Sequence, residues 1–352
     1  MKGGRITTAT KNRKSPPLIA PITICPRRLI DTRTLKLVEF EPVNGTVPSY
    51  AILSHRWIPE QEVIHEEFVQ PRKETFSKLG YRKIWAACKQ ARKDGIRYIW
   101  VDTCCIKQGN HADVQTNIMS MYAYYQNAEV CYAYLVDVKN KRDMFGEIKE
   151  TRLFGMVGGS EWFKRGWTLQ ELLAPRTVIF FNQNWQRIGD KHKLREHIHR
   201  RTTIPPAILS GEESVQDVDV LTRMSWATGR VTTRQQDKAY CLQGLLGVTV
   251  QPDYDESWFT SFNRLGKALF DARPELKERL GIDDYLFCNP YSGNFWYLLS
   301  GRFSDAQNKI LYAHRDQQVI AEHGYMVRKR TRCTPSDSRF SNHTHAFVVS
   351  VS

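Results

Sequence analysis

The sequence predicts an α/β protein built on a parallel β-sheet flanked by helices, and two patterns support this prediction. Between residues 50 and 181, short apolar runs rich in β-branched and aromatic residues alternate with longer stretches of helical periodicity. Two of these runs end abruptly in polar clusters, at residues 54–57 (SHRW) and 102–105 (DTCC). Ligands of parallel sheets bind beyond the carboxyl ends of the strands, so both clusters are expected at one edge of the sheet.

The predicted strands begin soon after the N-terminal extension. Residues 28–40 (RLIDTRTLKLVEF) predict a short strand pair that ends at the turn formed by Asn44 and Gly45. Residues 50–53 (YAIL) are continuously apolar, as in a strand that is buried on both faces. The strands expected after them occupy residues 96–101, 130–135 and 177–181.

Three helices are expected between these strands. Apolar residues recur with helical spacing over residues 84–91, and again over residues 114–128 behind a capping residue, Asn110. A third helix is expected from its cap at Ser160 to Leu173. This alternation of strands and helices is typical of right-handed crossovers in a parallel sheet.

Composition divides the chain into four expected regions. Beyond residue 185 the pattern changes to helices and then, near the C-terminus, to a few strand-like runs. The regions are a basic disordered extension (1–27), the α/β domain (28–185), a helical annex packed on it (186–285) and a small strand-rich region (286–352).

The net charge is less informative than its size suggests. The chain carries 51 basic and 37 acidic residues, which gives +14, and half of this excess lies in residues 1–30. No zinc-finger spacing, RNP-like aromatic motif or heptad accompanies the basic residues, so no specific nucleic-acid partner is expected. With 41% hydrophobic and 25% charged residues, the composition excludes wholesale disorder.

Cysteine usage and hydropathy indicate the compartment. The eight cysteines include no CxxC, and the adjacent Cys104 and Cys105 cannot hold a tetrahedral metal by themselves. No metal site is therefore expected. No apolar stretch approaches the roughly 18 residues of a spanning helix. We therefore expect a reduced, cytoplasmic protein without a membrane span.

Four ordered motifs carry a resemblance to a known family. They are YAILSHRW at 50–57, RYIWVDTCCI at 97–106, MY to NA at 121–128 and RGWTLQELLAP at 165–175. Together they resemble the fungal heterokaryon-incompatibility (HET) domain. Segments at 28–40, 223–227 (RMSWA) and 237–242 (DKAYCL) also look like this family, so the resemblance covers most of residues 28–250. The family's following PLLYGEG segment is represented only by Pro252, Asp253, Tyr254 and Glu256, without its glycines.

The resemblance implies a role in vegetative incompatibility, in which recognition of a non-self partner triggers cell death in fungi, a form of innate immunity. It implies self-association and another incompatibility or sensor protein as partners. Because HET domains are similar to TIR domains, it also implies a TIR-like or flavodoxin-like sheet. The sequence contains no P-loop motif, so a sensor module of that type is not expected within it.

The resemblance also implies a chemistry. Residues 167–172 (WTLQEL) look like the Trp-Cys-x-x-Glu-Leu box of TIR proteins, whose glutamate is catalytic in NAD glycohydrolases. Carried onto this chain, that residue is Glu171. Cleavage between nicotinamide and ribose develops oxocarbenium character, which a nearby carboxylate stabilises. NAD is thus expected as a substrate, with no permanently bound cofactor.

The expected ligand-binding residues surround Glu171 and the two strand-end clusters. They are Ser54, His55, Arg56, Trp57, Asp102, Arg165 and Trp167. Arginine forks match the oxygens of a diphosphate. Each residue also has a structural interpretation: Ser54 and His55 would satisfy backbone groups at the strand end, Arg165 would pair with Asp102 or Glu171, and the tryptophans would be core residues.

Two other functions remain open from the sequence. One is a Cys-His hydrolase or transferase in which Cys105 or Cys104 is the nucleophile, His55 the base and Asp102 the orienting group. The other is a non-enzymatic adaptor that signals by self-association, in which His55, Arg56 and Glu171 shape the fold or an assembly contact. Thiol alkylation would abolish the first activity, whereas self-association without loss of NAD would favour the second.

Overall fold

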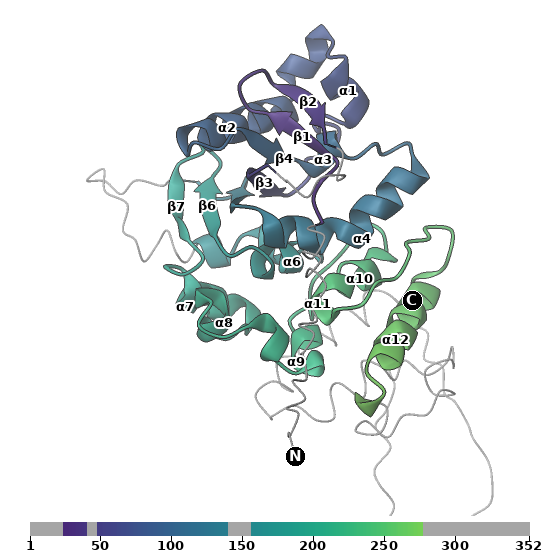
Figure 1. The fold of residues 1–352 in the computed structure, drawn as a ribbon. Helices are drawn as coiled ribbons and strands as arrows, with labels where there is room; N and C mark the ends of the chain where they lie inside the picture. Colours follow the sequence, from purple (N-terminus) through teal and green to yellow (C-terminus); the bar gives the residue numbers. More distant parts are fainter. Residues whose placement is uncertain (1–23, 41–47, 140–155, 277–352) are drawn as a thin grey trace, which may run out of the picture.

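The computed structural model describes residues 24–40, 48–139 and 156–276 (Figure 1). It confirms the predicted α/β fold, with helices around a seven-stranded mixed sheet of order β2-β1-β4-β3-β5-β6-β7. The strands are β1 (Arg28–Asp31), β2 (Lys36–Glu39), β3 (Tyr50–His55), β4 (Tyr98–Trp100), β5 (Val130–Leu135), β6 (Val178–Asn182) and β7 (Arg187–Asp190). Nearly all of the expected N-terminal extension and the whole expected C-terminal strand-rich region lie outside the described residues.

The four central strands are parallel, as the sequence predicts. β3 lies between β4 and β5, with Ile52 opposite Trp100 on one side and Cys131 on the other, and β6 follows on the far side of β5. Every residue of β3 and β5 is buried, which explains why neither strand alternates apolar and polar residues. The carboxyl ends of β3 and β4 therefore lie next to each other.

The edges of the sheet are antiparallel, whereas the sequence predicts a parallel sheet with a short strand pair at residues 28–40, which β1 and β2 form. β1 pairs antiparallel with both β2 and β4, and β7 pairs antiparallel with β6. β7 lies in residues for which helices were expected. It forms because the Asn182 side chain accepts hydrogen bonds from the backbone N–H groups of Asn184 and Gln186, which turns the chain back on itself.

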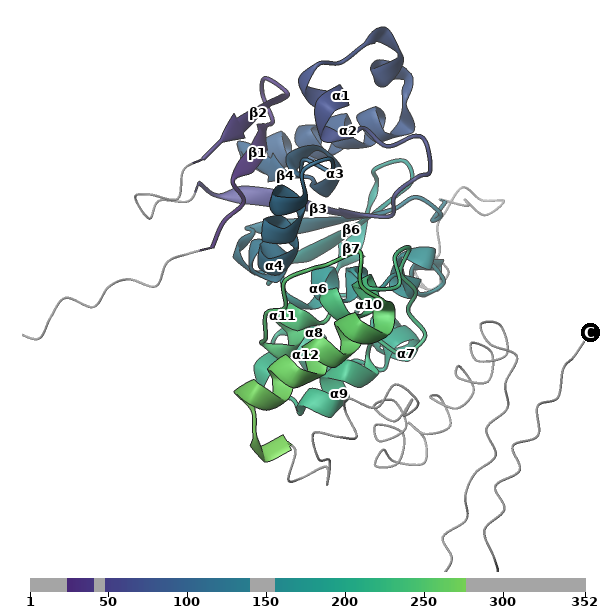
Figure 2. The same ribbon diagram turned by 90° about the vertical axis from the view of Figure 1, so that its right-hand side faces the viewer.

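Helices cover both faces of the sheet. In Figures 1 and 2, α2 lies on one side of the central strands, and α4 and α6 lie on the other. β4 lies on one side of β3, and β5 lies on the other side. The β3–β4 and β4–β5 connections therefore run in opposite directions across the sheet, and right-handed crossovers place their helices on opposite faces. The helices of this part are α1 (His65–Val69), η2 (Lys73–Ser77), α2 (Leu79–Lys93), α3 (Asp102–Cys105), α4 (His111–Asn127), η3 (Glu161–Lys164) and α6 (Thr168–Leu173).

The third predicted helix is interrupted in the structure. Ser160 caps η3 as expected, but the chain leaves the helix before α6 begins. At the interruption, the Gly166 N–H donates to the carbonyl of Val231 over 2.8 Å. A Cβ atom on Gly166 would come within 2.5 Å of the Thr232 side chain, so glycine permits this close approach. A segment distant in sequence thus contacts the start of α6.

The remaining helices gather below the sheet in Figure 1, on the side of α4 and α6. They are α7 (Arg195–Thr202), α8 (Pro206–Ser210), η4 (Val215–Asp217), α9 (Val220–Ser225), α10 (Asp237–Tyr240), α11 (Gln243–Leu246) and α12 (Trp258–Ala272). α11 contacts α4 at Gly244, whose missing side chain leaves room for Tyr122. Within the described ranges no helix is both long and apolar enough to span a bilayer.

Candidate functional site

A cavity of about 660 Å³ opens at the carboxyl ends of β3 and β4. Its lining includes most of the residues expected to bind a ligand: His55, Arg56, Trp57, Asp102, Arg165, Trp167 and Glu171. The first part of α4 and two loops of the helical region, residues 231–234 and 252–255, complete the lining. The strand-end clusters and the predicted glutamate therefore meet in one pocket.

Ser54 lies behind the pocket rather than in its lining. Its side chain is fully buried, and its hydroxyl donates a hydrogen bond of 2.5 Å to Oε2 of Glu171. The indole N–H of Trp162 in turn donates to the Ser54 hydroxyl over 2.8 Å. Ser54 therefore contacts the predicted catalytic carboxyl group, and it satisfies no backbone group in the described residues.

Glu171 combines deep burial with access to the cavity. Only 7% of the residue is exposed, and burial raises the pKa of its carboxyl group to about 7. The hydrogen bond from Ser54 and the positive charges of Arg165 and Arg230 act in the opposite direction and lower this pKa. Burial thus brings this pKa toward neutral pH, which suits a group that must be charged in one step and neutral in another.

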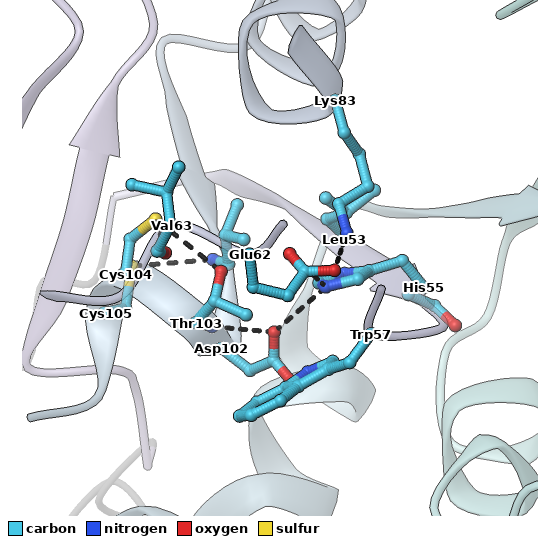
Figure 3. A network of polar contacts seen from close by, with 12 residues as sticks. Leu53, His55, Trp57, Glu62, Val63, Lys83, Asp102, Thr103, Cys104 and Cys105 are labelled. Atoms are coloured by element: carbon cyan, nitrogen blue, oxygen red, sulfur yellow. Dashed lines mark hydrogen bonds and ion pairs between the residues drawn. The ribbon is translucent and has the colours of Figure 1, made fainter. Parts of the chain in front are cut away.

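Asp102 occupies the neighbouring strand end, at the start of α3. Its Oδ2 accepts a hydrogen bond of 2.7 Å from the indole N–H of Trp57 (Figure 3). Burial raises the pKa of the Asp102 carboxyl group to about 6, although the bond from Trp57 lowers it. Trp57 is 36% exposed and lines the cavity. Its hydrogen bond to Asp102 links the chain that follows β3 to the chain that follows β4.

His55 lies between two carboxyl groups. Its Nε2 is 3.6 Å from Asp102 Oδ1 and 3.8 Å from Glu62 Oε2, and neither ring nitrogen makes a hydrogen bond to the described residues (Figure 3). Burial holds the pKa of His55 well below 6.5, and the nearby charges of Lys83 and Arg165 lower it further. His55 is therefore neutral at physiological pH, and both of its ring nitrogens are buried.

Glu62 and Lys83 complete this buried network, although neither lies in a segment that the sequence marks as functional. Lys83 Nζ donates to Glu62 Oε1 over 2.6 Å, and both side chains are buried. Glu62 comes from the segment after β3, and Lys83 from α2. No motif marked this pair, because only the tertiary fold brings the two segments together.

The positive charge of the pocket comes from arginines. Arg56 and Arg165 both line the cavity, and neither forms an ion pair with a carboxylate among the described residues. One interpretation of the sequence had Arg165 paired with Asp102 or Glu171, but the described residues show no such ion pair. Two guanidinium groups without internal partners leave their donors available for anionic groups of a ligand.

The cavity lining also includes residues from two segments of the family resemblance to which the sequence assigned no role. The Tyr254 hydroxyl donates a hydrogen bond of 2.8 Å to Asp237 Oδ1. Burial raises the pKa of the Asp237 carboxyl group, and the neighbouring Trp167 lowers it. The guanidinium of Arg234 lies 4.2 Å from the centre of the Tyr254 ring. Asp237 lies in the DKAYCL segment and Tyr254 in the PDY remnant, so these motifs were the available signal.

The cysteine chemistry finds no support in this geometry. Cys104 and Cys105 are buried, lie outside the cavity lining and make no described hydrogen bond to His55 (Figure 3). The Cys104 thiol donates to the carbonyl of Val63. Burial raises the pKa of Cys105 to about 12 and that of Cys104 well above its usual value, so neither forms a thiolate near neutral pH. No group of metal-binding side chains occurs in the described part of the chain.

Comparisons with known proteins agree with the motifs. The family model described as "Heterokaryon incompatibility protein (HET)" matches residues 50–153. The chain contains a HET domain. The matched range holds the strand-end clusters of the pocket, whereas Arg165, Trp167 and Glu171 lie beyond it.

A curated relative extends this similarity over more of the chain. The vegetative incompatibility protein HET-E-1 of Podospora anserina is 42% identical over 243 residues, which cover 68% of this chain and 17% of the relative. The HET-domain chain thus spans about a sixth of the length of this relative. No solved structure matches the chain at a significant level.

Proposed function

We propose that this HET-domain chain acts in vegetative incompatibility and triggers cell death by hydrolysing NAD+ in the pocket at the ends of β3 and β4. The relative is named as an incompatibility protein, and the 42% identity supports a shared role for the region in common. The observation that carries the chemistry is Glu171, a carboxyl group with a raised pKa at the wall of a cavity that also contains two unpaired arginines.

The pocket suits a dinucleotide in size and in charge. A cavity of about 660 Å³ falls within the usual range for small-molecule sites, which is about 300 to 1,000 Å³. In the proposed complex, Arg56 and Arg165 bind the diphosphate, and Trp57 and Trp167 offer aromatic surface to the bases. The parallel strands run in the order β4-β3-β5-β6, which corresponds to the order of flavodoxin-like sheets and supports a TIR-like assignment.

The proposed reaction breaks the bond between nicotinamide and the ribose anomeric carbon. As nicotinamide leaves with the bonding electrons, positive charge develops on the ribose, and the ionised Glu171 stabilises it. Water then adds to the anomeric carbon and releases one proton, which gives ADP-ribose. Asp102 lies at the same cavity, and its ionised carboxylate is the group available to accept that proton.

A second candidate function is a non-enzymatic adaptor, and one observation favours it. Large apolar side chains are exposed on consecutive elements at the far end of the molecule from the helical region, namely Ile64, Val69, Phe76, Leu79 and Trp85. Exposed apolar side chains grouped in this way commonly mark interaction surfaces. In this case the chain would signal by self-association, and the pocket would shape the fold.

Expression in a fungal host distinguishes the two candidates. The wild-type chain, Glu171→Gln and the exposed control Glu196→Gln are expressed at equal levels, and viability and cellular NAD+ are followed together. The enzyme proposal predicts that wild type and Glu196→Gln deplete NAD+ before cells die, and that Glu171→Gln does neither. Death at unchanged NAD+ levels, undiminished in Glu171→Gln, would contradict the enzyme proposal and favour the adaptor.

A further inference from the structure

Ser54 lies in the middle of a chain of three polar groups that ends at Glu171. The residue belongs to β3, and its side chain is completely buried. Its oxygen accepts a hydrogen bond of 2.8 Å from Trp162 Nε1, and its hydroxyl hydrogen is directed to Glu171 Oε2 over 2.5 Å. Ser54 and Trp162 lie outside the lining of the ligand cavity, whereas Glu171 belongs to it.

The direction of these hydrogen bonds follows from the chemistry of the groups. An indole N–H can only donate, and a serine hydroxyl has one hydrogen. Because the Ser54 oxygen already accepts from Trp162, its single hydrogen is free to bond Glu171. An ionised carboxylate can only accept a hydrogen bond, so Trp162 and Glu171 both require the same orientation of the Ser54 hydroxyl.

Trp162 is held firmly enough to impose that orientation. It is 1% exposed, and its ring packs edge-on against Phe163 and Phe180, with centroids 4.8 and 5.7 Å apart. Its backbone carbonyl also accepts a hydrogen bond of 2.6 Å from the Thr168 hydroxyl at the start of α6. The donor and the helix that carries Glu171 are thereby linked to each other.

The chain of bonds occupies one oxygen of Glu171 and leaves the other available. Oε2 receives the Ser54 hydroxyl, whereas Oε1 makes no hydrogen bond to the described residues. Glu171 nevertheless lines the cavity. We propose that Ser54, oriented by Trp162, is a positioning residue that fixes Glu171 through Oε2 and presents Oε1 to the ligand.

Two consequences follow from this arrangement. The first is geometric, since a carboxyl group held at one oxygen cannot rotate away from the reacting ribose. The second is electrostatic, since a hydrogen bond donated to the charged form opposes the effect of burial on the Glu171 pKa. The catalytic part of this inference rests on the proposed glycohydrolase function, whereas the contact itself does not.

The test measures the ionisation of Glu171 without a ligand and, separately, the pH profile of NAD+ cleavage. The protein is labelled with ¹³C at glutamate side-chain carboxyl carbons, and Glu171→Gln identifies the signal. In Ser54→Ala the Glu171 pKa is expected to rise by about 1 to 2 pH units, because a hydrogen bond to a charged group is lost. The rise in kcat that accompanies the ionisation of Glu171 should shift to higher pH by the same number of pH units.

Two further variants make the result specific. Ser261→Ala removes an equally buried and hydrogen-bonded serine hydroxyl in α12, and it should leave both quantities unchanged. Trp162→Phe keeps a core aromatic ring but removes the donor, and it should shift the Glu171 pKa in the same direction as Ser54→Ala by a smaller amount. If Ser54→Ala does not fold, Trp162→Phe decides the question.

The outcomes separate this inference from the proposed function. An unchanged Glu171 pKa in folded Ser54→Ala, or in Trp162→Phe when that variant decides, overturns the positioning role even if the wild type cleaves NAD+. A raised Glu171 pKa in a protein that never cleaves NAD+ supports the contact and refutes the glycohydrolase. A raised pKa together with a shifted pH profile supports both.

Discussion

Lys83 and Glu62 form a buried ion pair behind His55, with Lys83 Nζ 2.6 Å from Glu62 Oε1 (Figure 3). Glu62 Oε1 also accepts from the backbone N–H of Ile58, which connects the pair to the loop after β3. Burial lowers the pKa of Lys83, while Glu62 acts to keep it charged. The pair therefore supports the strand-end loop that carries Arg56 and Trp57 into the pocket.

Removing the lysine from this pair should destabilise the fold strongly. Lys83→Met leaves the Glu62 carboxylate buried without its partner, which costs about 3 to 5 kcal/mol of unfolding free energy. The double variant Lys83→Met/Glu62→Gln should recover most of this loss. Urea denaturation measures both, with Lys267→Met as the control, because its exposed pair with Asp271 contributes at most about 0.5 kcal/mol. Equal losses in Lys83→Met and Lys267→Met would contradict this account.

The raised pKa of Glu171 predicts a stability effect with a definite sign. Because the folded-state pKa is about 7, above the ordinary value of 4.5, the folded protein binds more protons than the unfolded chain between these pH values. Unfolding free energy contributed by the neutral carboxyl is thus lost as pH rises from about 4.5 to 7. Glu171→Gln should then be more stable than wild type at pH 8, by at most about 3 kcal/mol, and nearly equal at pH 4.

Thermal unfolding at the two pH values measures this difference. The control is Glu196→Gln, whose side chain is 57% exposed and should show no such pH dependence. The same gain in Tm at pH 4 and pH 8 would show that the charge of Glu171 is not the cause.

Arg165 is expected to determine ligand affinity. Its guanidinium lines the cavity without an ion-pair partner among the described residues, so a bound diphosphate gains charge-assisted hydrogen bonds from it. Arg165→Met should weaken ADP-ribose binding about 10- to 100-fold, as measured by calorimetry in the Glu171→Gln background. Arg187→Met on the exposed edge strand β7 is the matched control and should retain the affinity. Equal affinities in the two variants would exclude Arg165 as a phosphate-binding residue.

The buried cysteines should be dispensable for cleavage of NAD+. Cys104→Ala and Cys105→Ala each remove a thiol that is neutral near pH 7 and lies outside the pocket lining. Each variant should keep kcat within about threefold of wild type while losing roughly 1 kcal/mol of stability. A folded Cys105→Ala protein that had lost a hundredfold or more in kcat would restore the Cys-His chemistry as the better explanation.

The sequence was sufficient for the part of the site that depends on strand ends. The apolar runs 50–53 and 96–101 predict parallel strands, which places His55 and Asp102 at one edge of the sheet, and the structure shows that these two strands are neighbours. Glu171 was assigned to the site from a family resemblance, not from the periodicity of the sequence. The parallel pairing of buried strands therefore brings residues from separate sequence motifs into a common site.

Other features depend on contacts that no local pattern contains. The Glu62–Lys83 pair joins a loop to α2, and the Asp237–Tyr254 pair comes from the helical region, so only tertiary packing brings each pair together. The interruption of the third helix at Gly166 has the same origin, because it requires the loop at Val231. Local propensity favours a continuous helix there, and the tertiary contact overrides it.

The most direct test of the central claim is nicotinamide release by the purified chain. Wild type and Glu171→Gln are incubated with NAD+ over a range of protein concentrations that includes self-associated material, and products are separated by chromatography. The account predicts equal amounts of nicotinamide and ADP-ribose from the wild type and a rate at least about 100-fold lower from folded Glu171→Gln. Equal rates from the two proteins, or no release at any concentration, would contradict it.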